Sequence, residues 1–208
     1  MAQAQQERAV RTRAALIRAA AEEFDLAGYA GTSTTKIIKR AGSTMGALYF
    51  HFGSKEGVAR AVMNEQGADL PEPAGRSGLQ HLIDFTLELA RELRSNVLLR
   101  AGVRLAVEQG AFGIQDDTAY QLWITRFKEE LIVADALGEL REGVDPAGFA
   151  RVLVGAYSGT QLLSRISAGH EDLQDRIADL WRYFLPAIAR PEVIEKLEFG
   201  TRGPGTGR

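Results

Sequence analysis

The 208-residue sequence has no cysteine, which excludes disulfide bonds and thiolate metal sites. It has only three histidines, His51, His81 and His170, and they lie far apart in the sequence. No apolar run approaches the roughly 20 residues that a membrane-spanning helix needs. The polar and basic start, MAQAQQERAVRTR, lacks the apolar stretch of a secretory signal. We therefore expect a soluble, cytoplasmic protein without a metal, a cofactor or a membrane partner.

Motifs of the common enzyme classes are missing as well. The sequence contains no GxSxG nucleophile elbow, no GxxxxGK[ST] phosphate-binding loop and no HExxH zinc motif. The nearest approach is GAYSG at residues 155–159, whose serine is one place off the elbow pattern and falls within a predicted helix. We therefore expect a binding protein and not an enzyme.

Charge is distributed unevenly along the chain. Residues 1–60 contain nine lysines and arginines and five acidic residues, a net charge of +4, although the whole chain carries −2. A basic amino-terminal segment on an acidic body indicates a polyanion as the partner of that segment. The alternative is an ordinary solvated helical surface, because such asymmetry is common.

Apolar residues recur at helical spacing along the whole chain, and no alternating strand of useful length is found. We therefore predict an all-α fold of about nine or ten helices. The first helix is predicted over residues 6–27, before Gly28. Two long helices are predicted at about 146–168 and 171–189, with apolar stripes suited to packing against each other and a twofold mate.

The stretch AGSTMGALYFHFGSKE, residues 41–56, indicates a helix-turn-helix, in which the third helix lies in the DNA major groove. Gly46 and Ala47 leave room for a close approach to bases, and Ala47 can touch a thymine methyl group. Leu48 and Phe50 are predicted to point inward. The alternative is that LYFHF is an aromatic wedge in a helical core. The candidate DNA-binding residues are Ser33, Thr34, Thr35, Thr44, Met45, Gly46, Ala47, Tyr49, His51 and Lys55.

These residues carry a resemblance to a known family. AAEEFDLAGYAGTS, followed by AGSTMGALYFHFGSKE, resembles the TetR family of bacterial transcriptional repressors, and RAGVRLA with VGAYSGTQLLSRIS resembles the γ-butyrolactone receptors of Streptomyces. The resemblance implies a homodimer that binds a palindromic operator, represses antibiotic (secondary-metabolite) genes and is released by a small lactone. Met45 departs from the usual lysine of the family, which removes a cation able to contact guanine.

The resemblance also implies a ligand pocket with a tryptophan at its base, a position that Trp123 matches. The alternative for Trp123 is an ordinary core tryptophan. We predict a helix-turn-helix domain at residues 1–53, a ligand-binding and dimerisation domain at 54–199, and a disordered tail at 200–208. The candidate ligand-binding residues are Trp123, Phe127, Gln66, Phe85, Tyr157, Thr160 and Gln161.

Two other regulators remain open at this point. One is a repressor of a drug-efflux gene that responds to bulky amphipathic compounds. The other is a receptor-like regulator that senses an antibiotic in place of a lactone, or senses nothing. Such a regulator is expected to be more basic, because basicity raises non-specific attraction to DNA, and the sequence pI of about 6.0 favours a true receptor.

Overall fold

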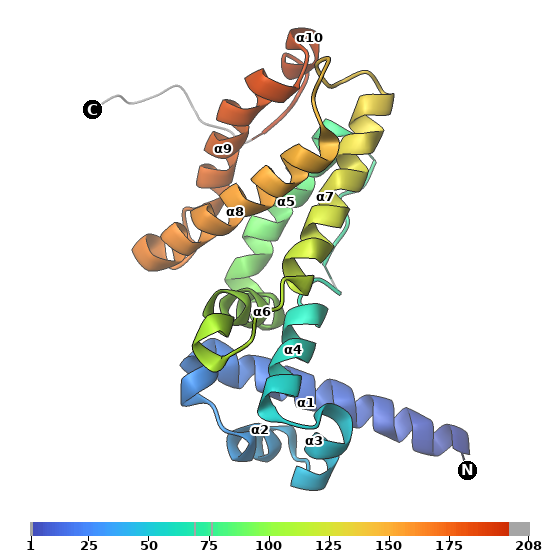
Figure 1. Ribbon diagram of the computed structural model, residues 1–208, viewed down its shortest axis with the longest axis vertical. Helices are drawn as coiled ribbons and strands as arrows, with labels where there is room; N and C mark the ends of the chain where they lie inside the picture. Colours follow the sequence, from blue (N-terminus) through green and yellow to red (C-terminus); the bar gives the residue numbers. More distant parts are fainter. Residues whose placement is uncertain (1, 69, 76, 200–208) are drawn as a thin grey trace. The chain divides into compact units, whose positions relative to one another are not determined.

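The computed structural model describes residues 2–68, 70–75 and 77–199 (Figure 1). These residues form ten α-helices and one short 3-10 helix, with no strand beyond a single isolated bridge between Leu140 and Ala189. The predicted all-α fold is confirmed. The tail predicted to be disordered, residues 200–208, lies outside the described residues. In the described part of the chain, no helix combines the length and apolar character needed to cross a membrane.

The chain divides into two compact units, and each combines segments that are distant in sequence. The first unit contains residues 1–69 and 96–119, and the second contains residues 70–95 and 120–208. The helices of the first unit are α1 (Ala2–Gly31), α2 (Thr34–Ala41), α3 (Met45–Phe52), α4 (Lys55–Glu65), α6 (Val97–Glu108) and η1 (Gln109–Phe112). Those of the second unit are α5 (Leu79–Ser95), α7 (Thr118–Ala136) from Tyr120 onward, α8 (Pro146–Ala168), α9 (Leu173–Ile188) and α10 (Pro191–Ile194).

Local hydrogen bonds set the bounds of α2 and α3. The Ser33 hydroxyl accepts the Lys36 N–H at 3.2 Å and starts α2, and Gly42 ends it with φ 57°, a left-handed conformation that suits glycine. The Thr44 hydroxyl accepts the Ala47 N–H at 3.2 Å and starts α3. With α1, these helices form the predicted helix-turn-helix arrangement.

The first helix changes direction at Gly28, where the sequence predicts its end. Gly28 has φ 68° and ψ −178°, so its backbone is not helical, although the assigned helix continues to Gly31. A Cβ atom at Gly28 would lie 2.6 Å from Arg104 Nη2. Both the conformation and the close approach favour glycine. The helix begins earlier than predicted, at Ala2.

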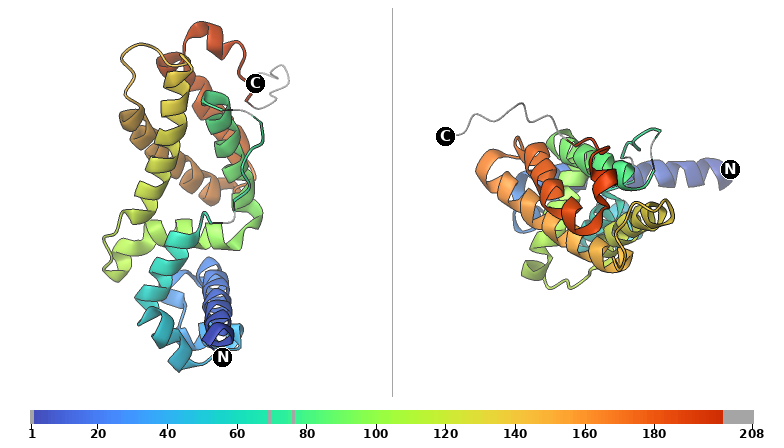
Figure 2. Two further views of the ribbon diagram at one scale, coloured as in Figure 1. Left: turned by 90° about the vertical axis from the view of Figure 1, so that its right-hand side faces the viewer. Right: turned by 90° about the horizontal axis from the view of Figure 1, so that it is seen from above.

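The core of the second unit is built around α9, which packs against α5 and α8 (Figure 2). Trp181 of α9 is fully buried, and its indole N–H donates to Thr86 Oγ1 of α5 at 2.8 Å. The Asp145 carboxylate accepts backbone N–H groups of Ala147 and Gly148, at 3.0 and 2.9 Å, and starts α8 where it is predicted. The structured part of this unit is therefore an α-helical body with a buried aromatic centre.

Candidate nucleic-acid interface and ligand site

The outer face of α3 consists of Gly46, Tyr49 and Phe50, which are exposed like Gly53 just after the helix, whereas Leu48 is fully buried. The prediction that Phe50 points inward is wrong, because its exposed fraction is 81%. In a helix with 3.6 residues per turn, positions 48 and 50 are about 200° apart around the axis. Only one of the two can face the core, and Leu48 does.

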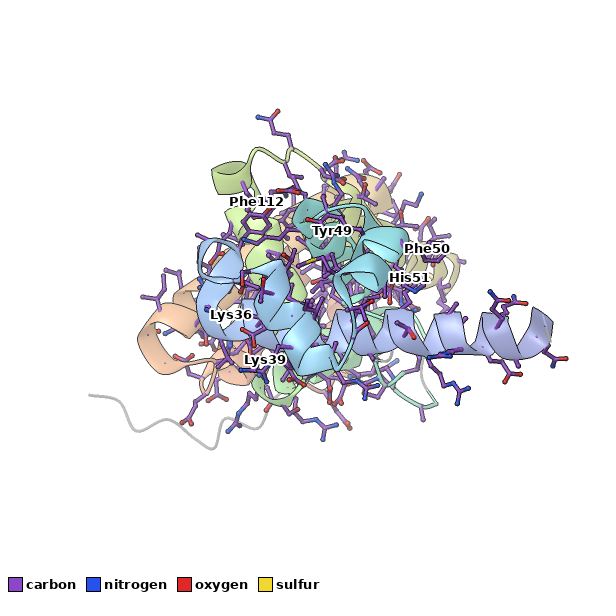
Figure 3. The ribbon with its side chains drawn as sticks, turned by 90° about the horizontal axis from the view of Figure 1, so that it is seen from below. Lys36, Lys39, Tyr49, Phe50, His51 and Phe112 are labelled. Atoms are coloured by element: carbon purple, nitrogen blue, oxygen red, sulfur yellow. The ribbon has the colours of Figure 1, made fainter. Side chains whose placement is uncertain are left out.

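Two lysines of α2 lie on the same side of the first unit as α3. Lys36 and Lys39 of α2 are seen from below together with Tyr49, Phe50 and His51 of α3 (Figure 3). Both lysines are exposed; the Lys36 ammonium donates to the Gly31 carbonyl at 3.0 Å. The sequence prediction did not include them, although their i, i+3 spacing on a short helix is a usable signal.

The hydroxyl residues at the helix starts are also on the surface. Ser33, Thr35 and Thr44 are exposed, and Thr34 is half-buried. The Ser33 and Thr44 hydroxyl oxygens accept backbone N–H groups, so each hydroxyl hydrogen stays available to an acceptor such as phosphate. Met45 and Ala47 are half-buried beside them. The candidates that precede Tyr49 thus surround the starts of two successive helices.

Lys55 is held in an aromatic cluster formed by the end of α1, the start of α4 and η1. Its ammonium nitrogen lies 3.9 Å from the centre of the Tyr29 ring, and burial lowers its pKa. Tyr29 stacks on Phe112, with ring centroids 3.7 Å apart and 17° between planes. Lys55, a predicted phosphate donor, is therefore already engaged with an aromatic face.

The Tyr29 hydroxyl extends this cluster to α4. It donates to Glu56 Oε1 at 2.6 Å. This hydrogen bond, with a second from Ser54, lowers the pKa of Glu56 to about 2. Burial, followed by the bond to Glu56, raises the pKa of Tyr29 well above its ordinary value. A tyrosine of α1 is thus tied to both η1 and α4.

Several arginines of the first unit are paired with acids. Arg40 contacts Glu22 at 2.8 Å and Glu23 at 2.7 Å, Arg13 contacts Glu65 at 2.6 Å, and Arg60 pairs with Asp116. The positive charge that a polyanion meets is therefore smaller than the count of basic residues suggests.

The RAGVRLA segment of α6, residues 100–106, forms hydrogen bonds and an ion pair with the end of α1. The Arg100 guanidinium donates to both carboxylate oxygens of Asp25, with the shortest contact at 2.8 Å. Arg104 donates to the Asp25 carbonyl at 2.8 Å and to Glu108 at 2.7 Å. The Tyr29 N–H in turn donates to Glu108 at 3.3 Å. These arginines hold α6 against the turn of α1 that precedes Gly28.

Three of the predicted ligand-binding residues form one aromatic cluster in the second unit. The ring centroids of Phe85, Trp123 and Phe127 are each 6.3 Å from the other two. Phe85 and Phe127 are buried, whereas Trp123 is half-buried, and the Arg126 guanidinium lies 4.8 Å from the centre of the Phe85 ring. The cluster is therefore a largely buried aromatic group, reached by solvent mainly at Trp123, with the Arg126 guanidinium against one ring.

The predicted polar residues of α8 lie in the same unit. Tyr157 is buried, its hydroxyl donates to the Thr86 carbonyl at 3.3 Å, and burial raises its pKa. Gln161 is buried and Thr160 is half-buried. Because Thr86 follows Phe85 on α5, this helix contacts both the aromatic cluster and Tyr157.

Gln66 belongs to the first unit, unlike the other six candidates for ligand binding. It follows the last residue of α4, its exposed fraction is 5%, and its Oε1 has no hydrogen-bond partner among the described residues. It packs against Gly102 of α6, where an added Cβ would lie 2.5 Å from Gln66 Cβ. It also lines a pocket of about 380 Å³ with residues of α1, α4 and the start of α6: Ala14, Ile17, Arg18, Ala21, Glu22, Glu65, Asn96, Val97 and Leu98.

The described ranges hold no cluster of side chains suited to a metal ion. No group of three histidine, aspartate or glutamate side chains is arranged there to hold a metal ion. The site residues place exposed lysine and hydroxyl side chains on the first unit, and an aromatic cluster with polar neighbours in the second.

Comparisons with known proteins found similar sequences and solved structures. A family model for bacterial regulatory proteins of the tetR family matches residues 16–68. The A-factor receptor protein of Streptomyces griseus is 38% identical over 195 residues, which cover 94% of this chain and 70% of that protein. The solved structure of TylP, a TetR regulator from Streptomyces fradiae, is 42% identical with a TM-score of 0.83 and 93% of each chain covered. A solved γ-butyrolactone receptor (ArpA-like protein) is 28% identical, with a TM-score of 0.65 and 91% of this chain and 93% of that chain covered.

Proposed function

Because the chain belongs to the TetR family of bacterial regulatory proteins, whose members are not enzymes, we propose that it is a ligand-responsive transcriptional repressor. It binds a palindromic operator as a homodimer, and a γ-butyrolactone-type signal releases it from genes of antibiotic synthesis. Its place of action is the bacterial cytoplasm, on the nucleoid when it is bound to DNA.

The capped pair α2 and α3, with an open outer face on α3, is the observation that carries the DNA-binding proposal. Backbone N–H groups at the start of α2, together with the Ser33 and Thr44 hydroxyls, contact phosphates. Lys39 supplies a cation, and Tyr49 and His51 supply further donors. Gly46 and Ala47 permit α3 to approach base edges closely. Residues 1–53 are thus assigned to DNA reading.

Dimerisation is proposed to use α8 and α9. One face of α8 presents exposed Val152, Leu163 and Ile166 at helical spacing, with exposed Gly155 and Gly159 between them. An added Cβ at either glycine would meet nothing within 4 Å, so a second helix has room to approach. Such a face is suited to a four-helix interface between two copies. Two reading helices about 34 Å apart would then match successive major grooves of one duplex.

The effector is proposed to bind within residues 54–199, on the aromatic cluster. Trp123, Phe127 and Phe85 supply apolar contact, and Tyr157, Thr160 and Gln161 supply polar groups for a lactone. Gln66, at the end of α4, links this event to the reading helices. By linkage, an effector that weakens DNA binding is itself bound more weakly by the DNA-bound protein.

The test is binding of the purified protein to its own upstream DNA across a salt series, with and without synthetic γ-butyrolactones of several acyl chain lengths. Tight, salt-sensitive binding that a lactone reverses supports the whole proposal. Trp123→Ala should keep operator binding and lose the response. Release by amphipathic drugs or antibiotics alone would replace the lactone with the efflux or antibiotic alternative. Absence of any sequence-selective binding would remove the DNA-binding proposal.

A further inference from the structure

The reading helix α3 carries none of the side chains that make paired hydrogen bonds to bases. Its sequence, MGALYFHF, has no arginine, lysine, asparagine, glutamine or acid. Arginine or lysine paired with guanine, and asparagine or glutamine paired with adenine, are the commonest specific contacts in the major groove. A helix without these residues needs another way to distinguish base pairs.

The outer face of α3 is instead aromatic. Phe50 is 81% exposed and Tyr49 is 52% exposed, with Gly46 one turn before Phe50 on the same face. The Phe50 ring makes a perpendicular contact with His51, with centroids 5.1 Å apart, so it is supported from one side. The neighbouring lysines, Lys36 and Lys39, provide the positive charge that a duplex requires of this surface.

The major groove presents one apolar group that distinguishes a natural base, the C5-methyl group of thymine. An exposed phenylalanine can neither donate nor accept a hydrogen bond. Contact with a methyl group removes apolar surface of both from water, which makes the free energy of binding more favourable. Gly46 adds no side chain that would hold the helix away from the groove. Phe50 and the thymine methyl are therefore complementary in shape and in polarity.

Building on the proposed repressor function, we propose that Phe50 is a specificity-determining residue that reads thymine methyl groups in the operator. The half-site then has thymine opposite the carboxyl-terminal half of α3, and its recognition depends on methyl contact in place of paired hydrogen bonds. Each contacted methyl group contributes about fourfold to affinity, the value of burying one such group.

The experiment replaces thymine with deoxyuridine, which removes the methyl group and keeps every hydrogen-bonding group. The duplex is the one that the full-length protein prefers from its own upstream DNA, remade with deoxyuridine at single positions of each half-site. Dissociation constants are measured for the unmodified protein, Phe50→Ala and Leu26→Ala. Leu26 is a matched control, because it is an apolar residue 72% exposed on α1. Circular dichroism and thermal unfolding check that both variants fold.

The expected result is a pair of positions at which deoxyuridine weakens the unmodified protein and Leu26→Ala about fourfold per methyl group. Phe50→Ala should bind the thymine and deoxyuridine duplexes equally. A Phe50→Ala protein that keeps the full thymine preference overturns the inference and leaves the repressor function intact. Equal weakening of Phe50→Ala on operator and unrelated DNA also overturns it. If the unmodified protein prefers no duplex at all, the repressor function itself fails, and this inference fails with it.

Discussion

At the scale of single residues, Gly102 of α6 lies in close contact with Gln66, the residue that follows α4. An added Cβ at Gly102 would lie 2.5 Å from Gln66 Cβ and 3.1 Å from the Val62 carbonyl oxygen. The second neighbour is backbone, which cannot turn aside as a side chain can. The distance between the two helices is therefore set by the absence of a side chain at position 102.

Gly102→Ala is expected to lower the free energy of unfolding, because overpacking costs about 1–3 kcal/mol. This loss exceeds the gain of roughly 0.5–1 kcal/mol that alanine brings to a helix interior. Urea unfolding followed by circular dichroism measures the difference. Gly110→Ala is the control, since an added Cβ there would meet nothing within 4 Å. Equal stability of the two variants would contradict the argument.

The Tyr29–Glu56 hydrogen bond makes the free energy of unfolding depend on pH in the acid range. This bond is the largest of several causes, with the Ser54 hydrogen bond next, that lower the pKa of Glu56 from 4.5 to about 2, so its contribution is present above pH 4.5 and disappears as the pH falls toward 2. Tyr29→Phe keeps the ring and removes the donor. The stability difference between the unmodified protein and Tyr29→Phe should therefore be largest near neutral pH and shrink in this acid range. A difference that stays constant from pH 6 to pH 2 would count against this assignment.

Phe50 shows which residue-scale features the sequence could not supply. Serine, threonine and aspartate favour helix caps, as observed at Ser33, Thr44 and Asp145, because a cap is decided within three or four residues. The burial of one aromatic residue in LYFHF depends on how α3 rotates against α1. Residue type alone favours burial of both Leu48 and Phe50, but in the structure Leu48 is buried and Phe50 is exposed.

At the scale of elements, α6 is bound to α1 by charge as well as by apolar contact. The Arg100–Asp25 pair joins two helices distant in sequence, and both side chains are 23% exposed. Such a pair is less solvated than a surface pair, so its loss lowers the free energy of unfolding more. The sequence identified RAGVRLA only through a family resemblance. In the structure, this segment joins α6 to α1.

Asp25→Asn is expected to destabilise the protein by about 1–2 kcal/mol, between the values for exposed and buried ion pairs. Thermal or urea unfolding measures this loss. Glu88→Gln is the matched control, because its partner Arg91 is 61% exposed and lies three residues away on the same helix. The expected change there is under about 0.5 kcal/mol. A control variant as unstable as Asp25→Asn would refute the special role of the α1–α6 pair.

The elements themselves were predicted well where their signals are local. The long helix predicted at 146–168 is observed as α8, because Asp145 and Pro146 mark its start and Gly169 its end. The association of Tyr29 with Phe112 was not predictable, because 83 residues separate them and neither has a distinctive pattern. Helical spacing places the ligand candidates Trp123 and Phe127 on one face, Phe85 was predicted to complete the pocket from another helix, and the structure brings all three rings together.

At the scale of the whole molecule, the exposed face of α8 is the proposed junction of two copies. Leu163 and Ile166 are 60% and 74% exposed. Introduction of a charge at such a position places an unpaired ion in an apolar interface. We therefore expect dimer formation and operator binding to be lost together.

Leu163→Glu is expected to give a folded monomer that binds operator DNA at least a hundredfold more weakly, about 3 kcal/mol, because one reading helix contacts only a half-site. Analytical ultracentrifugation and anisotropy measure the two properties. Leu122→Glu, on an exposed position of α7 outside this face, should leave both unchanged. A dimeric Leu163→Glu protein would move the proposed interface away from α8.

The paired cations of the first unit affect how the protein finds its operator. Arg13, Arg40 and Arg60 are held by acids, and Lys55 lies over the Tyr29 ring. Each phosphate contact adds about 0.9 to the salt dependence of DNA affinity, so arginines already paired with acids add less to this dependence than the nine basic residues of the segment 1–60 suggest. Residence on random genomic DNA should therefore be shorter than the basic-residue count alone suggests. We expect bulk DNA to hold a correspondingly smaller share of the cellular pool, so that operator occupancy follows the concentration of the regulator more closely.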